Sequence, residues 1–161
     1  MSEILSEVDY FDEAVHVMED LYGKDVPMPI ATIKDDAPNI RVIDMYFAHE
    51  RFYATSYALS NKVKEIEKNP NIAINHNLFV AHGTAKNIGN PLKKDNLPIR
   101  EELKQAFCSF YEKHINEEDE NTCILEINLK DAILFANDYK YCINFEKKYA
   151  TREDFVVDIV Y

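Results

Sequence analysis

The chain has 161 residues, of which 47% are hydrophobic and 29% charged, and this balance excludes a disordered chain and suits one domain. The formal net charge of −11 argues against nucleic acid or an anionic membrane surface as a general partner. No apolar run approaches the roughly 20 residues of a membrane span, and the amino-terminal segment carries acids where a signal peptide needs basic and apolar residues, so we expect a cytoplasmic protein.

The first half of the chain predicts one helix followed by three strands. Residues 10–23 place apolar side chains at helical spacing, with Leu21 and Tyr22 on the inward stripe and Gly23 as the cap. Residues 28–34, 39–48 and 50–56 are β-rich or alternate between polar and apolar side chains. We therefore expect three short antiparallel strands.

The middle of the chain predicts two helices separated by two strands. A short helix begins at Ser60, with Leu59, Val63 and Ile66 facing inward, and ends before Pro70. Strands follow over 71–77 and 78–89, and after a linker the longest helix covers 98–114. The acidic loop 116–121 lacks the EF-hand spacing, so we expect it to be solvated.

The last third returns to strands, predicted over 122–129, 132–137, 140–146 and 154–161. About eight short strands at hairpin spacing, with few helices between them, favour a mainly β fold and a closed antiparallel barrel. The chain has three glycines and neither a GxGxxG motif nor a P-loop, which disfavours a dinucleotide-binding fold.

The cysteines and histidines give no sign of a metal site. Three widely spaced cysteines, Cys108, Cys123 and Cys142, form no CxxC pair, and we expect buried, reduced thiols. The histidines show no metal-ligand spacing, and no nucleophile elbow is present. No residue is singled out as a general acid or base, so the catalytic residues are unknown from the sequence.

The stretch from Thr55 to Lys62 is the first candidate for binding chemistry. Ser60 stands where it can cap a helix, but Lys62 lies in the first turn, where a cation opposes the helix dipole. Thr55 and Ser56 end the preceding strand and lie within reach of the same place. Two interpretations stay open: an ordinary capped helix with a lysine extending into water, or a phosphate site at the helix start.

Arg41 is the second candidate, because alternation places it on the same face as Ile43 and Met45. A guanidinium on an apolar face needs an anionic partner or an exit to water, and the sequence allows both. Asp44 lies on the opposite face and is a candidate partner for a lysine.

The order of motifs resembles the pyridoxamine 5'-phosphate oxidase-like family of FMN-binding split barrels. The similar segments are "IATIKDDAPNIRVIDMYF", "RFYATSYALSNKVKEIEKNPNIAI" and "VAHGTAKNIG". The family shows a strand with A-T, an R-V strand, a Y-x-T strand, S-x-K before a helix ending in N-P, and a G-x-A strand. The likeness covers about residues 28–90, and we expect one domain over 1–161 in which a helix at 98–114 and further strands extend this core.

The resemblance implies a split β-barrel of Greek-key type with short peripheral helices and an FMN cofactor. It implies that the FMN phosphate contacts Arg41, Ser60 and Lys62, with Asn61 in the same site. It also implies a homodimer with two flavin sites at its interface. Further implied positions are Thr55 and Ser56 against the phosphate or ribityl chain, and the backbone of Val42 and Ile43 near the isoalloxazine ring.

Two departures from the family pattern qualify this expectation. The spacing from Thr55 to Lys62 is one residue longer than usual, so either Ser56 takes the role of the threonine or the loop bulges. The chain has no tryptophan and ends in "DFVVDIVY", whereas true pyridoxamine phosphate oxidases end in a tryptophan-and-arginine motif. We therefore predict an FMN-dependent oxidoreductase with a small aromatic or quinone-like substrate, but not a pyridoxamine phosphate oxidase.

Three alternatives remain at the level of the sequence. One is a nitroimidazole-reductase-like enzyme, in which His49 or His76 would act near the flavin. Another is a flavin- or haem-binding module that senses or stores redox equivalents without turnover. The third is a chain with this fold whose cofactor site is lost or altered.

Overall fold

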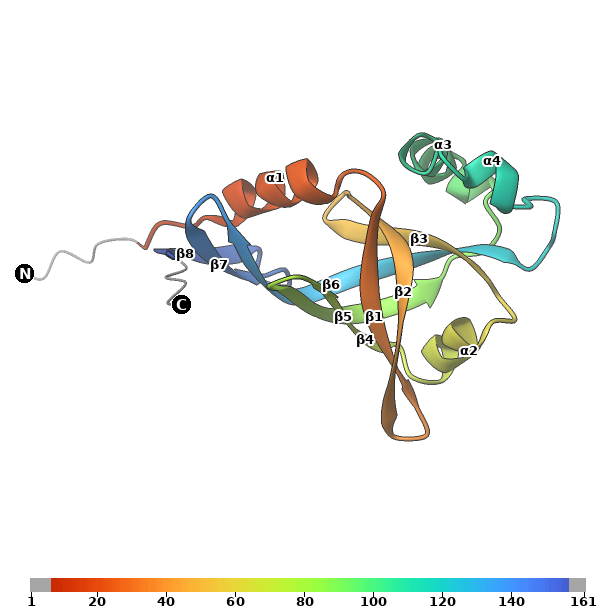
Figure 1. The fold of residues 1–161 in the computed structure, drawn as a ribbon, viewed down its shortest axis with the longest axis horizontal. Helices are drawn as coiled ribbons and strands as arrows, with labels where there is room; N and C mark the ends of the chain where they lie inside the picture. The colour runs from red at the N-terminus through yellow and green to blue at the C-terminus, as the bar shows by residue number, and fades with distance from the viewer. Residues whose placement is uncertain (1–6, 157–161) are drawn as a thin grey trace, which may run out of the picture.

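The chain forms one antiparallel sheet that closes on itself, as seen in a computed structural model that describes residues 7–156 (Figure 1). The strand order is β3-β2-β1-β4-β5-β6, and pairing of β3 with β6 closes these six strands into a barrel. Two further strands, β7 and β8, extend the sheet beyond β6. The strands are β1 Val26–Lys34, β2 Ala37–Ala48, β3 Arg51–Tyr57, β4 Asn71–His76, β5 Phe79–Asn87, β6 Thr122–Ala136, β7 Tyr139–Asn144 and β8 Tyr149–Asp154. The predicted antiparallel barrel is confirmed.

Short helices surround the barrel. They are α1 Phe11–Tyr22, α2 Asn61–Lys68, the 3₁₀ turn η1 Lys94–Asn96, α3 Leu97–Ala106 and α4 Tyr111–His114. Helix α1 packs on β2, β7 and β8, whereas α2 packs on β1 and β5 beside the long β1–β2 hairpin (Figure 1). No helix within the described residues is long and apolar enough to span a bilayer.

The main core fills the barrel with the inward side chains of alternate strand positions, and α1 closes one side. The inward stripe of α1 was predicted nearly in full, except that Leu21 is 38% exposed. Tyr22 takes the buried position at the end of this helix, where its ring packs on Phe52 and Phe79. Leu59 was also predicted inside and is exposed, because it lies in the turn before α2.

A second apolar cluster lies outside the barrel, where α3 and α4 cover the outer face of β3 and β6. Tyr53 and Ile124 of the sheet pack there against Leu103, Phe107 and Tyr111. The prediction of one continuous helix over 98–114 is wrong, because the chain turns between Phe107 and Tyr111. Phe107 and Tyr111 are both buried on either side of this break, and Phe110 within it stacks on Phe107 at a centroid distance of 5.0 Å.

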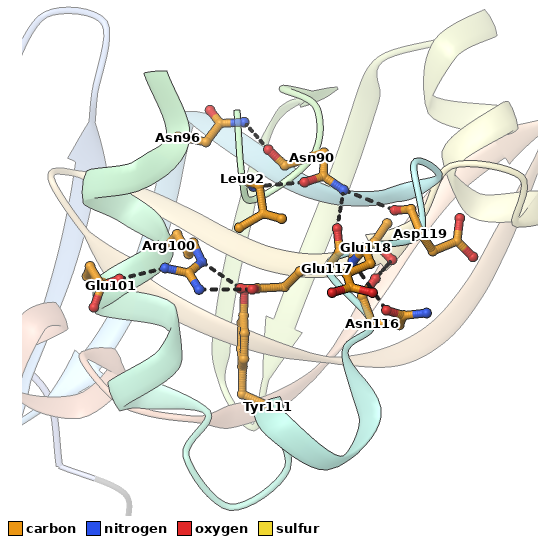
Figure 2. Close-up of polar contacts among 11 residues, drawn as sticks. Asn90, Leu92, Asn96, Arg100, Glu101, Tyr111, Asn116, Glu117, Glu118 and Asp119 are labelled. Atoms are coloured by element: carbon orange, nitrogen blue, oxygen red, sulfur yellow. Dashed lines mark hydrogen bonds and ion pairs between the residues drawn. The ribbon is translucent and has the colours of Figure 1, made fainter. Parts of the chain in front are cut away.

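The acidic loop after α4 is more than a solvated segment, which corrects the sequence prediction. Both carboxylate oxygens of Glu117 accept hydrogen bonds from Arg100 of α3, at 2.6 and 2.9 Å, as Figure 2 shows. The Tyr111 hydroxyl donates a third bond to Glu117 at 2.8 Å. These bonds fasten the loop to the two helices. No group of three or more metal-ligating side chains occurs in residues 7–156.

The carboxyl-terminal strands differ from the prediction in two places. Residues 122–136 form one continuous strand instead of two, because the register shift in its pairing with β5 at His82/Gly83 is absorbed without a break. At this shift a side chain on Gly83 would collide with the carbonyl oxygen of Asn128, which explains the glycine. Within the described residues the last strand is β8, most of which lies where no strand was predicted. Of the strand predicted over 154–161, residues 155 and 156 are not in a strand, and 157–161 lie outside the described residues.

Candidate functional site

The barrel is open between β2 and β3, and this opening positions the candidate site. In the described chain these strands pair only from Tyr46↔Tyr53 to Ala48↔Arg51. Beyond this point β2 pairs with β1 alone and β3 with β6 alone. Helix α2 follows β3 and reaches back to β2 through its Glu65 side chain. Side chains from β2, β3 and α2 therefore meet at the split.

Ser56 and Ser60 bring two unpaired hydroxyls to the split. Ser56 follows Phe52 and Ala54 on the inward face of β3, and Ser60 is the residue before α2. The Oγ atoms of both serines are buried and have no hydrogen-bond partner in the part of the chain that the structure describes. Ser60 thus occupies the N-cap position without a capping hydrogen bond. Buried hydroxyls are normally hydrogen-bonded, so both are suited to a bound acceptor.

Lys62 adds a positive charge at the same place. Burial lowers the pKa of its ammonium, and the neighbouring Arg41 guanidinium lowers it further. Among residues 7–156, no carboxylate lies within 4 Å of its Nζ atom. A desolvated lysine that faces another cation is stabilised by an anion between them.

Arg41 lies on the inward face of β2, as the alternation predicted, and its anionic partner is within the chain. Its Nη2 donates to Glu65 Oε2 at 2.7 Å, and its Nη1 donates to Thr32 Oγ1 at 2.6 Å. Glu65 also accepts from Thr32 at 2.6 Å and from Asn39 at 2.9 Å. The sequence allowed either an anionic partner or an exit to water for the Arg41 guanidinium, and the anionic partner is the correct option.

Glu65 is the site residue that the sequence interpretation missed. Its hydrogen bond from Thr32 is the largest of several causes that lower its pKa to about 2, and bonds from Asn39 and Arg41 act in the same direction against its burial. It is therefore ionised at neutral pH and neutralises Arg41. No local pattern pointed to Glu65, because a residue two positions after Val63 lies on another face of the helix than the predicted apolar stripe.

The remaining predicted residues take separate places. Thr55 follows Tyr53 on the outer face of β3, so it points away from Ser56. Asn61, the first residue of α2, is exposed and lines a hollow with Lys64 and Lys68 instead of facing Ser56. Val42 is exposed on the outer face of β2, and the backbone of Val42 and Ile43 has no strand partner on the side of β3.

We call Arg41, Ser56, Ser60 and Lys62 the split cluster. It combines two unpaired hydroxyls, a desolvated ammonium and a guanidinium held by a carboxylate. This donor set fits a group with one centre of negative charge and several acceptor oxygens, as a phosphate has. Neither serine hydroxyl is hydrogen-bonded to a base within residues 7–156, so the cluster shows no activated serine nucleophile.

The two histidines proposed for a reductase lie elsewhere in the chain. His49 lies in the turn before β3, and Arg51, where β3 begins, is about 17 Å along the strand from Ser56 at the usual rise. Its Nε2 hydrogen-bonds Glu102 at 2.9 Å. His76 ends β4 and packs edge-on against Tyr22. Neither histidine joins the split cluster within one chain.

Only one of the three cysteines is buried, which corrects the prediction for the other two. Cys123 is opposite Ser56 on β6, and burial raises the pKa of its thiol to about 11 although Lys62 opposes the shift. Cys108 and Cys142 are exposed. Cys108 lies in the turn between α3 and α4, and Cys142 points outward from β7, so neither has a core position.

Asp44 faces another carboxylate instead of the lysine that the sequence suggested. Burial, and then the neighbouring Asp44, raise the pKa of Asp25 to about 6. Because the folded state holds the proton more tightly than the unfolded chain, this pair favours folding below about pH 4, and the advantage is lost as the pH rises through 6. We expect Asp25→Asn to stabilise the protein by about 1 kcal/mol at pH 8 and to have little effect at pH 4. Urea unfolding at both pH values tests this, and an equal difference at both would contradict it.

The comparisons with known proteins identify the fold. No family profile matches the sequence, and no curated protein is similar enough to match. A pyridoxamine 5'-phosphate oxidase-related, FMN-binding protein of Nostoc punctiforme has a similar structure, with a TM-score of 0.57, 15% identity, and coverage of 94% of this chain and 99% of that one. A NimC/NimA family protein of Clostridium acetobutylicum has a TM-score of 0.54 and 16% identity over 91% and 93% of the two chains. An FAD-binding protein of Mesorhizobium loti has a TM-score of 0.58 and 14% identity over 74% and 91%.

These similarities define the class of fold. A six-stranded antiparallel barrel opened between β2 and β3 is a split barrel. The chain has the split-barrel fold seen in pyridoxamine 5'-phosphate oxidase-related proteins, as the order of its sequence motifs predicted. At these identities the comparison establishes the fold alone.

Proposed function

We propose that the protein binds FMN, with the phosphate in the split cluster, and acts as a flavin-dependent oxidoreductase on a small substrate. The observation that carries this proposal is the pair of buried, unpaired hydroxyls of Ser56 and Ser60 beside the desolvated Lys62. The similar structures of an FMN-binding and an FAD-binding protein support a flavin over other phosphate ligands.

Each part of the site has a defined task in this proposal. Ser56 and Ser60 donate hydrogen bonds to phosphate oxygens, and Lys62 balances the charge. Glu65 already neutralises the charge of Arg41, so the task of Arg41 is to offer N–H donors in a fixed direction. The backbone of Val42 and Ile43 pairs with β1 but has no strand partner on the side of β3, and this free side is the edge that the ring would approach. The flavin supplies the hydride or electron transfer, so the absence of an acid–base pair from the split cluster is no obstacle.

The colour of the purified protein tests the proposal directly. We expect a yellow protein that releases FMN on denaturation, with mass spectrometry separating FMN from FAD. A colourless protein that takes up neither flavin from solution would refute the proposal. Reduction by NADH or NADPH with a quinone acceptor then tests turnover, and bound flavin without turnover would favour the binding module.

The hydroxyl that replaces the family's threonine is predicted to be Ser56, since Thr55 points to the other face of β3. Ser56→Ala should lower FMN affinity about tenfold or more, the effect of one hydrogen bond to a charged group. It should not destabilise the flavin-free protein, because the lost hydroxyl has no partner in the described chain. Thr55→Ala, measured in the same flavin-fluorescence titration, should leave the affinity unchanged. A larger loss of FMN affinity in Thr55→Ala than in Ser56→Ala would show that the loop rearranges on binding.

We also propose that two copies associate through the outer face of β2. Ile40 and Val42 are 67% and 63% exposed there, and Ala31 and Pro29 lie beside them in register on β1. A continuous apolar strip of this kind is typical of a protein interface.

A charged substitution at Val42 tests this association. Val42→Glu should weaken the dimer at least tenfold by placing a charge within the interface. Val8→Glu, at a similarly exposed valine before α1, is the control. Sedimentation velocity over a concentration series measures the change, and a wild-type protein that stays monomeric would contradict the dimer.

The cysteines support the cytoplasm as the proposed location. Cys108 and Cys142 are exposed and unpaired, and Cys123 is a buried free thiol. Exposed free thiols persist in a reducing compartment and are oxidised outside it.

A further inference from the structure

A second hollow lies apart from the split, between α3 and the outer face of the sheet. It has a volume of about 690 Å³. Its floor is formed by Tyr53, Glu126 and Lys86, which are neighbours in register across β3, β6 and β5. None of the residues that line it belongs to the split cluster. A ligand in this hollow would therefore be additional to one in the split.

One wall of the hollow is a loop held by its own hydrogen bonds. The buried Asn96 side chain donates to the carbonyl oxygens of Ile88 at 2.9 Å and Asn90 at 3.0 Å, and Figure 2 shows the second bond. The Asn87 side chain accepts from the Gly89 N–H at 2.8 Å. The shape of this wall is thus fixed by the protein and does not depend on a bound molecule.

Some charged side chains around the hollow have a hydrogen-bond or ion-pair partner, and others have none in the described chain. On the roof, Glu102 is engaged, because it contacts His49 at 2.9 Å and accepts from the Tyr46 hydroxyl at 3.3 Å. On the floor, Lys86 and Glu126 face each other in register, yet no ion pair within 4 Å joins them in residues 7–156. Opposite charges at such cross-strand positions normally stabilise a sheet by pairing. Here the Lys86 and Glu126 side chains both stay available to a bound ligand.

We propose that this hollow binds a small zwitterion, namely an α-amino acid with an apolar side chain. Its carboxylate lies toward Lys86 and Lys93, and its ammonium lies toward Glu126. Tyr53 of the floor and Ile99 of α3 are the apolar contacts for its side chain. A simple anion would meet the carboxylates of the hollow and a simple cation its lysines, so only a molecule with both charges matches the lining. This inference does not depend on flavin binding.

Calorimetric titration with matched probes tests the proposal. L-Phenylalanine and L-leucine are compared with 3-phenylpropanoate and 2-phenylethylamine, each of which lacks one charge of phenylalanine. We expect at least one amino acid to bind, and phenylalanine to bind at least tenfold more tightly than its two analogues, since each loses a charge-assisted hydrogen bond. No binding of either amino acid up to its solubility limit, or an analogue that binds as tightly, would overturn the proposal.

Substitutions then locate the bound amino acid. Lys86→Gln and Glu126→Gln should each weaken binding about tenfold, whereas Lys130→Gln, an exposed lysine farther along β6, should not. Thermal unfolding of each variant shows whether it is folded. FMN affinity should stay unchanged in all three, which separates this site from the flavin site. If the first two variants bind like the wild type, the amino acid binds elsewhere and the proposal is wrong.

Discussion

Replacing Lys62 with alanine should weaken FMN binding about ten- to a hundredfold while changing riboflavin binding little. Lys62 is the only member of the split cluster in residues 7–156 that carries a positive charge without a carboxylate partner. Loss of a charge-assisted hydrogen bond to phosphate costs about 1.5–3 kcal/mol, which corresponds to this range of affinity. Riboflavin has no phosphate, so the ratio of the two affinities isolates the effect. Quenching of flavin fluorescence measures both.

Lys64→Ala is the matched control for this experiment. Lys64 lies on the same helix, two positions further on, and its side chain is exposed toward the hollow beside the β1–β2 hairpin. It should leave the affinity ratio unchanged, and increasing salt should weaken FMN binding less in Lys62→Ala than in the wild type. Equal losses of FMN and riboflavin in Lys62→Ala would show that the lysine supports the fold and does not bind the phosphate.

The barrel was predictable from the sequence because local patterns and strand order agree. The alternation in β2 correctly placed Arg41 with Met45 on the inward face. Where the prediction failed, tertiary packing outweighed the local pattern. The helix predicted over 98–114 has a regular apolar stripe, but α3 ends at Ala106, where the chain turns and stacks Phe110 on Phe107 before α4 begins.

The candidate site was predictable in its parts but not in its pairings. Ser60 and Lys62 were identified from the helix start, and Arg41 from its apolar face. The partner of Arg41 was not, because Glu65 is 24 positions away and only the packing of α2 across the split brings the two together. The spacing from Thr55 to Lys62 was ambiguous for a related reason, since a strand's register decides which hydroxyl points inward.

Replacing Glu65 with alanine should lower the free energy of unfolding by about 3 kcal/mol. The Glu65 side chain is only 8% exposed, and its removal leaves the Arg41 guanidinium without its counter-ion. Breaking a buried ion pair from one side typically costs 3–5 kcal/mol, and we expect the lower end because Arg41 keeps 23% of its side chain exposed. Urea unfolding of the flavin-free protein measures the change. Glu67→Ala, on the exposed side of the same helix, should alter stability by less than about 0.5 kcal/mol.

The pH dependence of this loss in the free energy of unfolding shows whether the charge of Glu65 or its volume is responsible. The pKa of Glu65 in the folded protein is about 2, below its ordinary value, so the stability it contributes is fully present above about pH 5 and is lost as the pH falls toward 2. The difference between the wild type and Glu65→Ala should therefore be constant from pH 5 to pH 8 and should shrink in acid. A difference that persists unchanged at pH 3 would mean that Glu65 acts by filling space, and that Arg41 finds another partner when the carboxylate is gone.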